Sequence, residues 1–320
     1  MFQHILVPLD GSPLAEQALP VAAHIARQMK IPITLLQISS MSIEYGPYFS
    51  QAGMVREAII EEELAHARTY LQTLAQSPLL AGIATQSEAL PGIAPASILS
   101  YVDAHPIDLV IMCSHGFSGL KRWLLGSVAS QVGKHCTVPV LIVRAEQALS
   151  RDTAAKLRVL VALDGSSFAE AILEPAINLV ATLAGPSQGT LHLTQLLQLP
   201  TNEDEFVYKQ AGIDLAALRK SAVLAAGQYL QKVVEQLQHG IAAQRDVHVT
   251  WTTEECQDIA GTLLHMAEHG DSRGYNLLAL TTHGHNALQA WMVGSIAERV
   301  LHEAHLPLLV VHPPQSRFIH

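Results

Sequence analysis

The chain has 320 residues, of which 49% are hydrophobic and 15% are charged, a composition that suits packed cores and excludes intrinsic disorder. Its formal net charge is -9 and neither half has a basic stripe, which argues against nucleic acid as a partner. No apolar run approaches the roughly 20 residues that a membrane helix needs. The length favours two domains.

The first half of the chain alternates between short apolar runs and helical patterns. The apolar runs predict five strands, over 4–9, 33–38, 84–90, 108–113 and 139–143. The patterns between them predict four helices, over 13–29, 54–76, 95–104 and 119–135. Continuous apolar runs such as "LVIMC" are typical of strands buried on both faces of a parallel sheet.

A polar stretch at 145–157 predicts a linker, and the sequence after it repeats the first half. "HILVPLDGSPLAEQAL" at 4–19 matches "RVLVALDGSSFAEAIL" at 158–173. The distance from Gly126 to Pro139 equals that from Gly294 to Pro307, thirteen positions. We therefore predict two similar domains.

These domains are expected to span residues 1–147 and 156–313. Strands that alternate with helices through right-handed crossovers predict an α/β fold, with a doubly wound, five-stranded, Rossmann-like parallel sheet in each domain. In such a sheet ligands bind at the carboxyl ends of the strands, where the winding reverses.

Asp10 and Asp164 each follow the first strand of a copy. Either residue could be the N-cap of the helix that comes next. Alternatively, its carboxylate faces the crevice and accepts hydrogen bonds from a ribose hydroxyl or an adenine amine. The recurrence of the aspartate does not separate these two roles, because both copies need a helix start.

The loop after the fourth strand contains Gly116, then nine residues, then Gly126 and Ser127. Gly116 permits a positive φ or a close approach to a ligand. Ser127 can cap the next helix, whose free amides and dipole favour an anion such as a phosphate. A tight turn and a capped helix with nothing bound is the other interpretation. Gly284, Gly294 and Ser295 repeat the pattern in the second copy.

The sequence gives little evidence for a metal site or for catalytic residues. His265 and His269 have the i,i+4 spacing of two metal ligands, but no third ligand accompanies them at zinc-type spacing, so we predict no metal site. Ser12 and Ser127 lack the GxSxG pattern of an esterase nucleophile, and we predict no catalytic residues.

The three cysteines, Cys113, Cys136 and Cys256, form no CxxC pair and suggest reduced thiols. The opening "MFQHILVPLDGS" enters a strand without a secretory leader. We therefore expect a cytoplasmic protein.

Taken together, the motifs resemble those of the universal stress protein family over nearly the whole chain. They are "ILVPLDGS" and "VLVALDGS", "SHG…LLGSVA" and "THG…MVGSIAERVL", and the closing "VPVLIV" and "LPLLVV". The resemblance implies a tandem pair of domains of the adenine nucleotide alpha hydrolase type. It also implies contacts with ATP, or another adenine nucleotide with or without Mg²⁺, at two sets of residues. The implied phosphate contacts are Gly116, Gly126, Ser127, Gly284, Gly294 and Ser295, and Ser114, His115 and Gly119 are further nucleotide-binding candidates in the first loop. Asp10 and Asp164 would contact the ribose or the adenine, and Ile38 and Leu196 would line the adenine pocket.

The sequence departs from the family's nucleotide motif at its first glycine, which is Cys113 in one copy and Thr281 in the other. A Cβ there narrows the room for a phosphate. Only the first loop has cations, Lys121 and Arg122, so we expect the first copy to be the better site.

Two functions follow from the resemblance. One is a nucleotide-dependent switch in the stress response, with at most slow ATP hydrolysis or self-phosphorylation. The alternative is a nucleotide-free protein that acts through protein partners. The family's dimer contact further implies that strand 139–143 pairs with 307–311 within the chain as a pseudo-dimer, with a homodimer as a further option.

Overall fold

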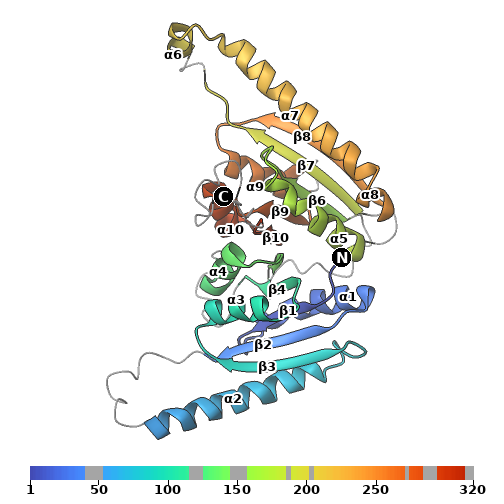
Figure 1. The fold of residues 1–320 in the computed structure, drawn as a ribbon, viewed down its shortest axis with the longest axis vertical. Coiled ribbons are helices and arrows are strands. Elements are labelled where there is room, and N and C mark those ends of the chain that lie inside the picture. Colours follow the sequence, from blue (N-terminus) through green and yellow to red (C-terminus); the bar gives the residue numbers. More distant parts are fainter. Residues whose placement is uncertain are drawn as a thin grey trace, which may run out of the picture. The chain divides into compact units, whose positions relative to one another are not determined.

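A computed structural model describes residues 1–39, 53–114, 125–144, 157–184, 189–201, 205–270, 274–283 and 294–313 (Figure 1). The chain divides into two compact units, formed mainly by residues 1–150 and 151–309. We call them unit 1 and unit 2. The predicted pairing of 139–143 with 307–311 concerns the placement of one unit relative to the other and stays a prediction.

Unit 1 is built on a five-stranded sheet with the order β3-β2-β1-β4-β5. Its strands are β1 (Ile5–Leu9), β2 (Ile33–Ser39), β3 (Thr85–Pro91), β4 (Leu109–Cys113) and β5 (Val140–Val143). The pairs of neighbouring strands are parallel, and the winding reverses between β1 and β4. This is the predicted doubly wound sheet, and the prediction is confirmed.

The helices of unit 1 lie on both faces of this sheet. They are the 3₁₀ turn η1 (Ala15–Ala18), then α1 (Leu19–Met29), α2 (Gly53–Ala75), α3 (Ala94–Ala104) and α4 (Ser127–His135). Helix α2 packs against β2 and β3, and α3 contacts α4. Figure 1 shows α3 and α4 on the side of the sheet away from α2. Right-handed crossovers dictate this distribution.

Unit 2 repeats the architecture with the order β8-β7-β6-β9-β10. Its strands are β6 (Leu157–Ala162), β7 (Gly189–Leu197), β8 (Val247–Glu255), β9 (Leu277–Thr281) and β10 (Leu308–Val311). Its helices are η3 (Ala169–Ile172), α5 (Leu173–Leu183), α6 (Glu205–Gln210), α7 (Leu215–Gln238), α8 (Ile241–Gln244), α9 (Ile259–His269) and α10 (Ser295–Glu303).

The core of each unit forms around its central strands. Every residue of β1, β4 and β9 is buried, as the continuous apolar runs of these strands predict. Burying one large aliphatic side chain contributes about 1.5–3 kcal/mol, so these strands are the rigid part of each sheet.

Two predicted helices start later than expected. The helix predicted over 13–29 begins as the 3₁₀ turn at Ala15 and becomes α-helical at Leu19, with Pro20 in its first turn. The helix predicted over 119–135 begins at Ser127, because Gly126 has an extended backbone with φ -60° and ψ 148°. No helix among the described residues is long and apolar enough to cross a membrane.

Candidate functional site

The aspartate that follows the first strand of each unit lies in a tight turn, which we call the Asp-Gly-Ser turn (10–12 and 164–166). Asp10 is exposed, and its Oδ1 accepts a hydrogen bond from the amide of Ser12 at 3.0 Å. Gly11 has φ +82°, the left-handed region that glycine adopts readily. The hydroxyl of Ser12 accepts from the amide of Ala15 at 3.1 Å. Ser12 rather than Asp10 therefore caps the turn that starts the helix.

Unit 2 has the same arrangement. Oδ1 of Asp164 accepts from the amide of Ser166 at 2.9 Å and from its hydroxyl at 2.6 Å. Gly165 has φ +85°, and the Ser166 hydroxyl accepts from the amide of Ala169 at 3.1 Å. In both units the serine does the capping, so the aspartate is not needed as the helix cap.

Ile38 lies near the end of β2, beside the Asp-Gly-Ser turn. The register of β1 and β2 pairs Leu9 with Gln37, so Ile38 comes one residue beyond the end of β1. A methyl group built on Gly92, in the loop before α3, would lie 3.9 Å from Ile38. Its counterpart Leu196 is 9% exposed near the end of β7. Both side chains are apolar and lie at the carboxyl edge of their sheets.

The end of β4 meets the start of α4 through a main-chain hydrogen bond. The amide of Gly126 donates to the oxygen of Ser114 at 2.7 Å. The amide of Gly294 likewise donates to the oxygen of Thr282 at 2.9 Å in unit 2. Because β4 pairs with β1, the structure brings Ser114, Gly126 and the adjoining Ser127 to the same sheet edge as Asp10. The predicted residues His115, Gly116, Gly119 and Gly284, together with Lys121 and Arg122, lie outside the described residues.

The predicted serine caps are wrong. Gly126 and Gly294 are the N-caps of α4 and α10, and neither cap makes a side-chain hydrogen bond. Ser127 and Ser295 are the first helical residues instead. The cap residues of both helices therefore supply no side chain to the first-turn amides, which suits anion binding at a helix N-terminus.

The backbone conformation does not require a glycine at either of these two caps. Gly126 and Gly294 both have φ -60°, a conformation open to any residue. Among the described residues, a methyl group built on Gly294 would meet only the main-chain oxygen of Thr282, at 3.7 Å, an ordinary contact distance. Gly11, at φ +82°, has a conformational reason to be glycine, whereas the two caps do not.

The first position of the nucleotide motif differs between the units. Cys113 is 5% exposed and ends β4. Thr281 is 8% exposed and ends β9, and its hydroxyl donates to the main-chain oxygen of His283 at 2.8 Å. Thr282 and His283 share a further side-chain hydrogen bond of 2.9 Å. The backbone after β9 is therefore tied by side chains.

Three residues that lie near the site were not among the site residues predicted from the sequence. Arg144, directly after β5, is 8% exposed, and burial lowers its pKa to about 10 while the nearby Cys113 opposes that shift. The other two are Glu16 and Tyr70, which are joined by a hydrogen bond of 3.0 Å beside the Asp-Gly-Ser turn. The signal for Glu16 was present in the sequence, because "DGSPLAE" recurs as "DGSSFAE".

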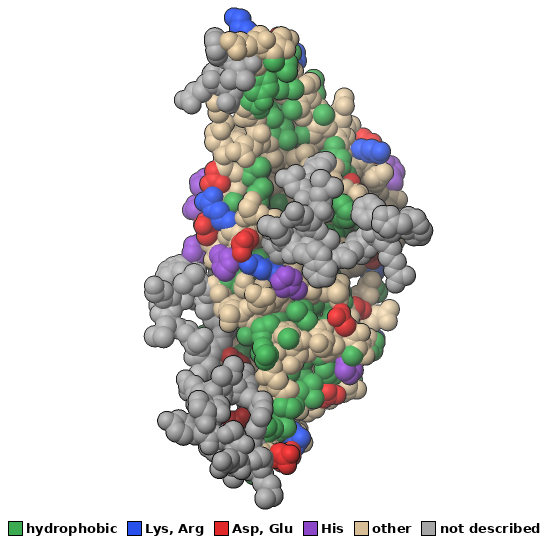
Figure 2. Space-filling model, turned by 60° about the vertical axis from the view of Figure 1, so that its left-hand side comes forward, with side chains coloured by type: hydrophobic (Ala, Val, Ile, Leu, Met, Phe, Trp, Pro, Cys, Tyr) green, Lys and Arg blue, Asp and Glu red, His purple; other side chains and the backbone are tan. Residues whose placement is uncertain are grey.

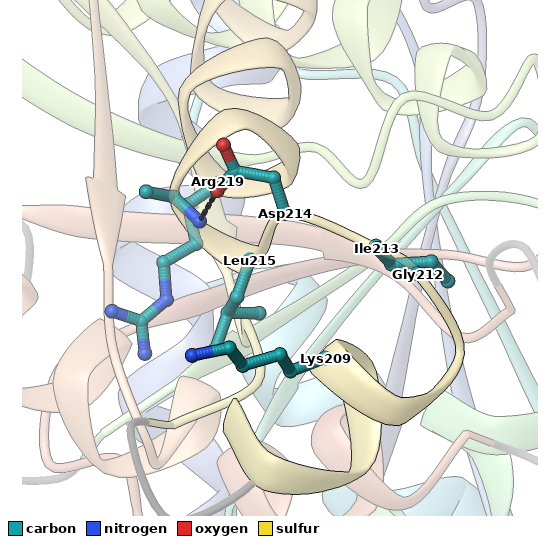
Figure 3. A pocket seen from close by; sticks show the side chains of 7 residues that line it. Lys209, Gly212, Ile213, Asp214, Leu215 and Arg219 are labelled. Carbon is teal, nitrogen blue, oxygen red and sulfur yellow. Dashed lines mark hydrogen bonds between the residues drawn. The ribbon is translucent and has the colours of Figure 1, made fainter.

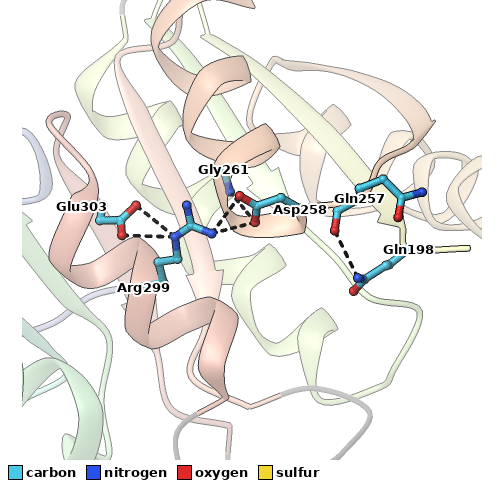
Figure 4. A network of polar contacts seen from close by, with 6 residues as sticks. All are labelled: Gln198, Gln257, Asp258, Gly261, Arg299 and Glu303. Carbon is cyan, nitrogen blue, oxygen red and sulfur yellow. Dashed lines mark hydrogen bonds and ion pairs between the residues drawn. The ribbon is translucent and has the colours of Figure 1, made fainter.

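A polar network links α9 and α10 in unit 2 (Figure 4). Arg299 forms an ion pair of 2.7 Å with Asp258, the N-cap of α9, and one of 3.0 Å with Glu303. The hydrogen bonds from Arg299 lower the pKa of Asp258. These groups are exposed, so the network orients the two helices more than it stabilises the unit.

A hollow of about 490 Å³ lies between α6 and α7 (Figure 3). Lys209 and Arg219 extend their cationic ends toward one side of it, while Asp214 caps α7 through the amides of Ala216 and Ala217 at 2.9 and 3.1 Å. Nε of Arg219 donates to the oxygen of Pro200 at 2.8 Å. No predicted site residue lines this hollow.

Apolar side chains are also exposed in this part of unit 2. Figure 2 shows hydrophobic side chains over the region that Figure 1 labels α6 and α7. Ile213, Leu218, Leu224 and Trp251 are 37–56% exposed. The rings of His265 and His269, which have the sequence spacing of two metal ligands, stack with centroids 4.9 Å apart. The described residues contain no group of three side chains that could hold a metal ion.

The two sheets, with matching turns after their first strands and matching helix starts after their fourth, define a tandem doubly wound α/β protein. The model of the universal stress protein family matches residues 1–144 and again 157–312. The chain therefore belongs to the universal stress protein family and contains two copies of its domain.

Relatives with one and with two domains match this chain. Universal stress protein Rv2623 of Mycobacterium tuberculosis is 28% identical over 314 residues, which cover 96% of this chain and 95% of the relative. Universal stress protein YxiE of Bacillus subtilis is 28% identical over 148 residues, 45% of this chain and 100% of the relative. The crystal structure of a universal stress protein from Archaeoglobus fulgidus has a TM-score of 0.66 at 20% identity, covering 97% of this chain and 98% of the other, and shows the shared fold.

Proposed function

We propose that unit 1 binds ATP or another adenine nucleotide at the carboxyl ends of β1 and β4, and that the protein acts as a nucleotide-dependent switch in the stress response. The observation that carries this proposal is the glycine at the start of α4. Its φ of -60° would suit any residue, so the backbone conformation does not explain the missing side chain, whereas a ligand that approaches the backbone would.

The rest of the site fits the parts of a nucleotide. The amides at the start of α4 and the hydroxyl of Ser127 would hold phosphate oxygens. Asp10, exposed and not required as a helix cap, would accept hydrogen bonds from the ribose or the adenine amine. Ile38 would pack against the base. A bound Mg²⁺ would neutralise part of the phosphate charge.

Two differences between the units support binding in unit 1. Arg144 places a buried positive charge beside Cys113 at this edge, whereas the matching residue of unit 2 is His312. A buried charge is screened by salt much less than an exposed one. In unit 2 the bond from Thr281 to His283 also fixes the backbone where the motif would approach a phosphate.

Isothermal titration with ATP and Mg²⁺ tests the proposal. Gly126→Asp places a carboxylate at the phosphate position of unit 1, and Gly294→Asp is the matched control in unit 2. We expect Gly126→Asp to abolish most of the binding and Gly294→Asp to leave it nearly unchanged. Equal losses would contradict the preference for unit 1, and a wild-type protein without ATP binding or a thermal shift at millimolar ATP would contradict nucleotide binding itself.

A nucleotide-free protein that acts through protein partners is the second candidate. The specific observation in its favour is that Cys113 and Thr281 replace the first motif glycine in both units. The same titration separates the two functions, because this candidate predicts no heat of binding with any adenine nucleotide.

A further inference from the structure

A hydrogen bond connects helix α2 to η1, the 3₁₀ turn that follows the Asp-Gly-Ser turn of unit 1. The hydroxyl of Tyr70, on α2, donates to Oε1 of Glu16, on η1, at 3.0 Å. Helix α2 packs on β2 and β3, whereas η1 contacts β1 and β4, so this bond joins elements on different strands. Burial, together with the carboxylates of Glu16 and Asp10, raises the pKa of Tyr70 well above its usual value. The hydroxyl therefore remains a donor at physiological pH.

Further hydrogen bonds lead from Glu16 back to Asp10. The amide of Glu16 donates to the oxygen of Ser12 at 3.3 Å, and the amide of Ala15 donates to the Ser12 hydroxyl at 3.1 Å. The amide of Ser12 in turn donates to Oδ1 of Asp10 at 3.0 Å. A displacement of Glu16 would therefore be transmitted to the Asp10 carboxylate.

The turn needs such a restraint because of its own composition. Gly11, at φ +82°, has a wide choice of backbone conformations, and Asp10 is exposed, so packing does not fix its carboxylate. Placing a hydrogen-bonding group precisely in a binding site requires support from neighbouring residues. Tyr70 supplies that support from a helix that is itself packed on the sheet.

Unit 2 repeats these side chains at equivalent places. Glu170 lies six residues after Asp164, as Glu16 lies six after Asp10, and Tyr229 lies on α7. Burial and the carboxylates of Glu170 and Asp164 raise the pKa of Tyr229. Its hydroxyl is buried and has no hydrogen bond within 3.5 Å among the described residues, although it lies close enough to Glu170 for that carboxylate to raise its pKa. Unit 2 therefore places the same two side chains near each other, with a longer contact than in unit 1.

We propose that Tyr70 and Glu16 are positioning residues for the nucleotide site of unit 1, which hold the Asp-Gly-Ser turn so that Asp10 meets the ribose or the adenine amine. This inference rests on the proposed nucleotide binding. It assigns to helix α2 a role in ligand affinity, although α2 contributes no group that touches the ligand.

A double-mutant cycle tests the positioning role. ATP affinity is measured by isothermal titration for wild type, Tyr70→Phe, Asp10→Asn and the double variant. Tyr70→Phe removes only the hydroxyl, so we expect ATP to bind about 3- to 10-fold more weakly, as for the loss of one hydrogen bond. The double variant should bind no more weakly than Asp10→Asn alone, because Tyr70 acts through Asp10.

Three controls separate positioning from a general effect on folding. Tyr229→Phe, the matched change in unit 2, should leave ATP affinity unchanged. Inorganic tripolyphosphate, which lacks the ribose and the base, should bind Tyr70→Phe as well as it binds wild type. Glu16→Gln keeps an acceptor oxygen and should retain most of the affinity, whereas Glu16→Leu should behave like Tyr70→Phe.

The possible failures are distinguishable. If wild type does not bind ATP, the proposed function fails and this inference fails with it. If wild type binds ATP but Tyr70→Phe does not weaken binding, only the positioning role is overturned. The positioning role is also overturned if Tyr70→Phe weakens ATP binding by the same factor in the wild-type and Asp10→Asn backgrounds. It is overturned as well if Tyr70→Phe weakens the binding of tripolyphosphate as much as the binding of ATP. If Tyr70→Phe does not fold, equal affinities of Glu16→Gln and Glu16→Leu overturn the role.

Discussion

The hydroxyl of Thr281 donates to the main-chain oxygen of His283 at 2.8 Å, so the last residue of β9 holds the backbone that follows it. Thr281 stands where the family's nucleotide motif has its first glycine. A glycine there would leave this carbonyl without the side-chain bond and would open space at the sheet edge. The difference between the units therefore includes a specific side-chain contact as well as a change of residue volume.

Thr281→Gly is expected to improve nucleotide binding in unit 2. It removes the bond to His283, which contributes on the order of 1 kcal/mol, and so lets the backbone adjust to a phosphate. The titration stoichiometry should rise from near one ATP per chain toward two. Thr281→Ser keeps the hydroxyl and is the matched control, which should stay near one. Equal stoichiometries for Gly and Ser would show that this bond does not limit binding.

Gly126→Ala should separate stability from binding. At φ -60° alanine is unstrained, so the free energy of unfolding should stay constant or rise by about 0.4–1 kcal/mol. ATP affinity should fall at least about 10-fold if a phosphate approaches this backbone. Urea unfolding and titration of the same preparation measure both quantities.

Gly11→Ala should destabilise the protein, in contrast to Gly126→Ala. At φ +82° a Cβ is strained, so the free energy of unfolding should fall by about 1–2 kcal/mol. If Gly126→Ala also destabilised the protein by this amount, the glycine would have a structural role, and the main support for the proposed nucleotide site would be lost.

The sequence predicted the fold well because its signals are local and repeated. The apolar runs that became β1 and β4 lie within a residue of their predicted bounds, and the second copy supplied an independent check on the first. The helix bound predicted at residue 119 was wrong, although the motif at Gly126 and Ser127 did indicate a helix start, because the start depends on the backbone angles of Gly126 and residue type alone does not give these angles. The serine caps failed for the same reason.

Contacts between distant elements were beyond sequence reasoning. Tyr70 meets Glu16 across 54 positions, and no local pattern indicates that these side chains form a pair. The burial of Arg144 depends on what packs around the end of β5. The roles of Asp10 and Ser12 were separated only by hydrogen-bond geometry, because either residue type can cap a helix.

The three cysteines should differ sharply in reactivity. Cys136 is 1% exposed, and burial raises its pKa to about 11, so little thiolate forms at neutral pH. Cys113 is 5% exposed, whereas Cys256 is partly exposed, although burial raises the pKa of this thiol too. A colorimetric disulfide reagent should modify Cys256 in the native protein and the other two only after unfolding. A Cys256→Ser variant that still reacts rapidly would contradict this order.

His4 should make the protein less stable as the pH falls below neutrality. Its Nε2 lies 2.9 Å from the hydroxyl of Thr34, and burial lowers the pKa of its imidazole below 6.5, although the carboxylate of Asp108 opposes the shift. The folded state therefore favours the neutral ring. As the pH falls through the pKa that His4 has in the unfolded chain, the unfolded chain binds a proton first. The free energy of unfolding then decreases until the pH has also passed the pKa of His4 in the folded protein. His4→Gln removes this titration, so its free energy of unfolding should fall less than that of wild type between about pH 7.5 and about pH 5.5. Urea unfolding across this range measures the difference, and parallel profiles for the two proteins would show that His4 does not contribute.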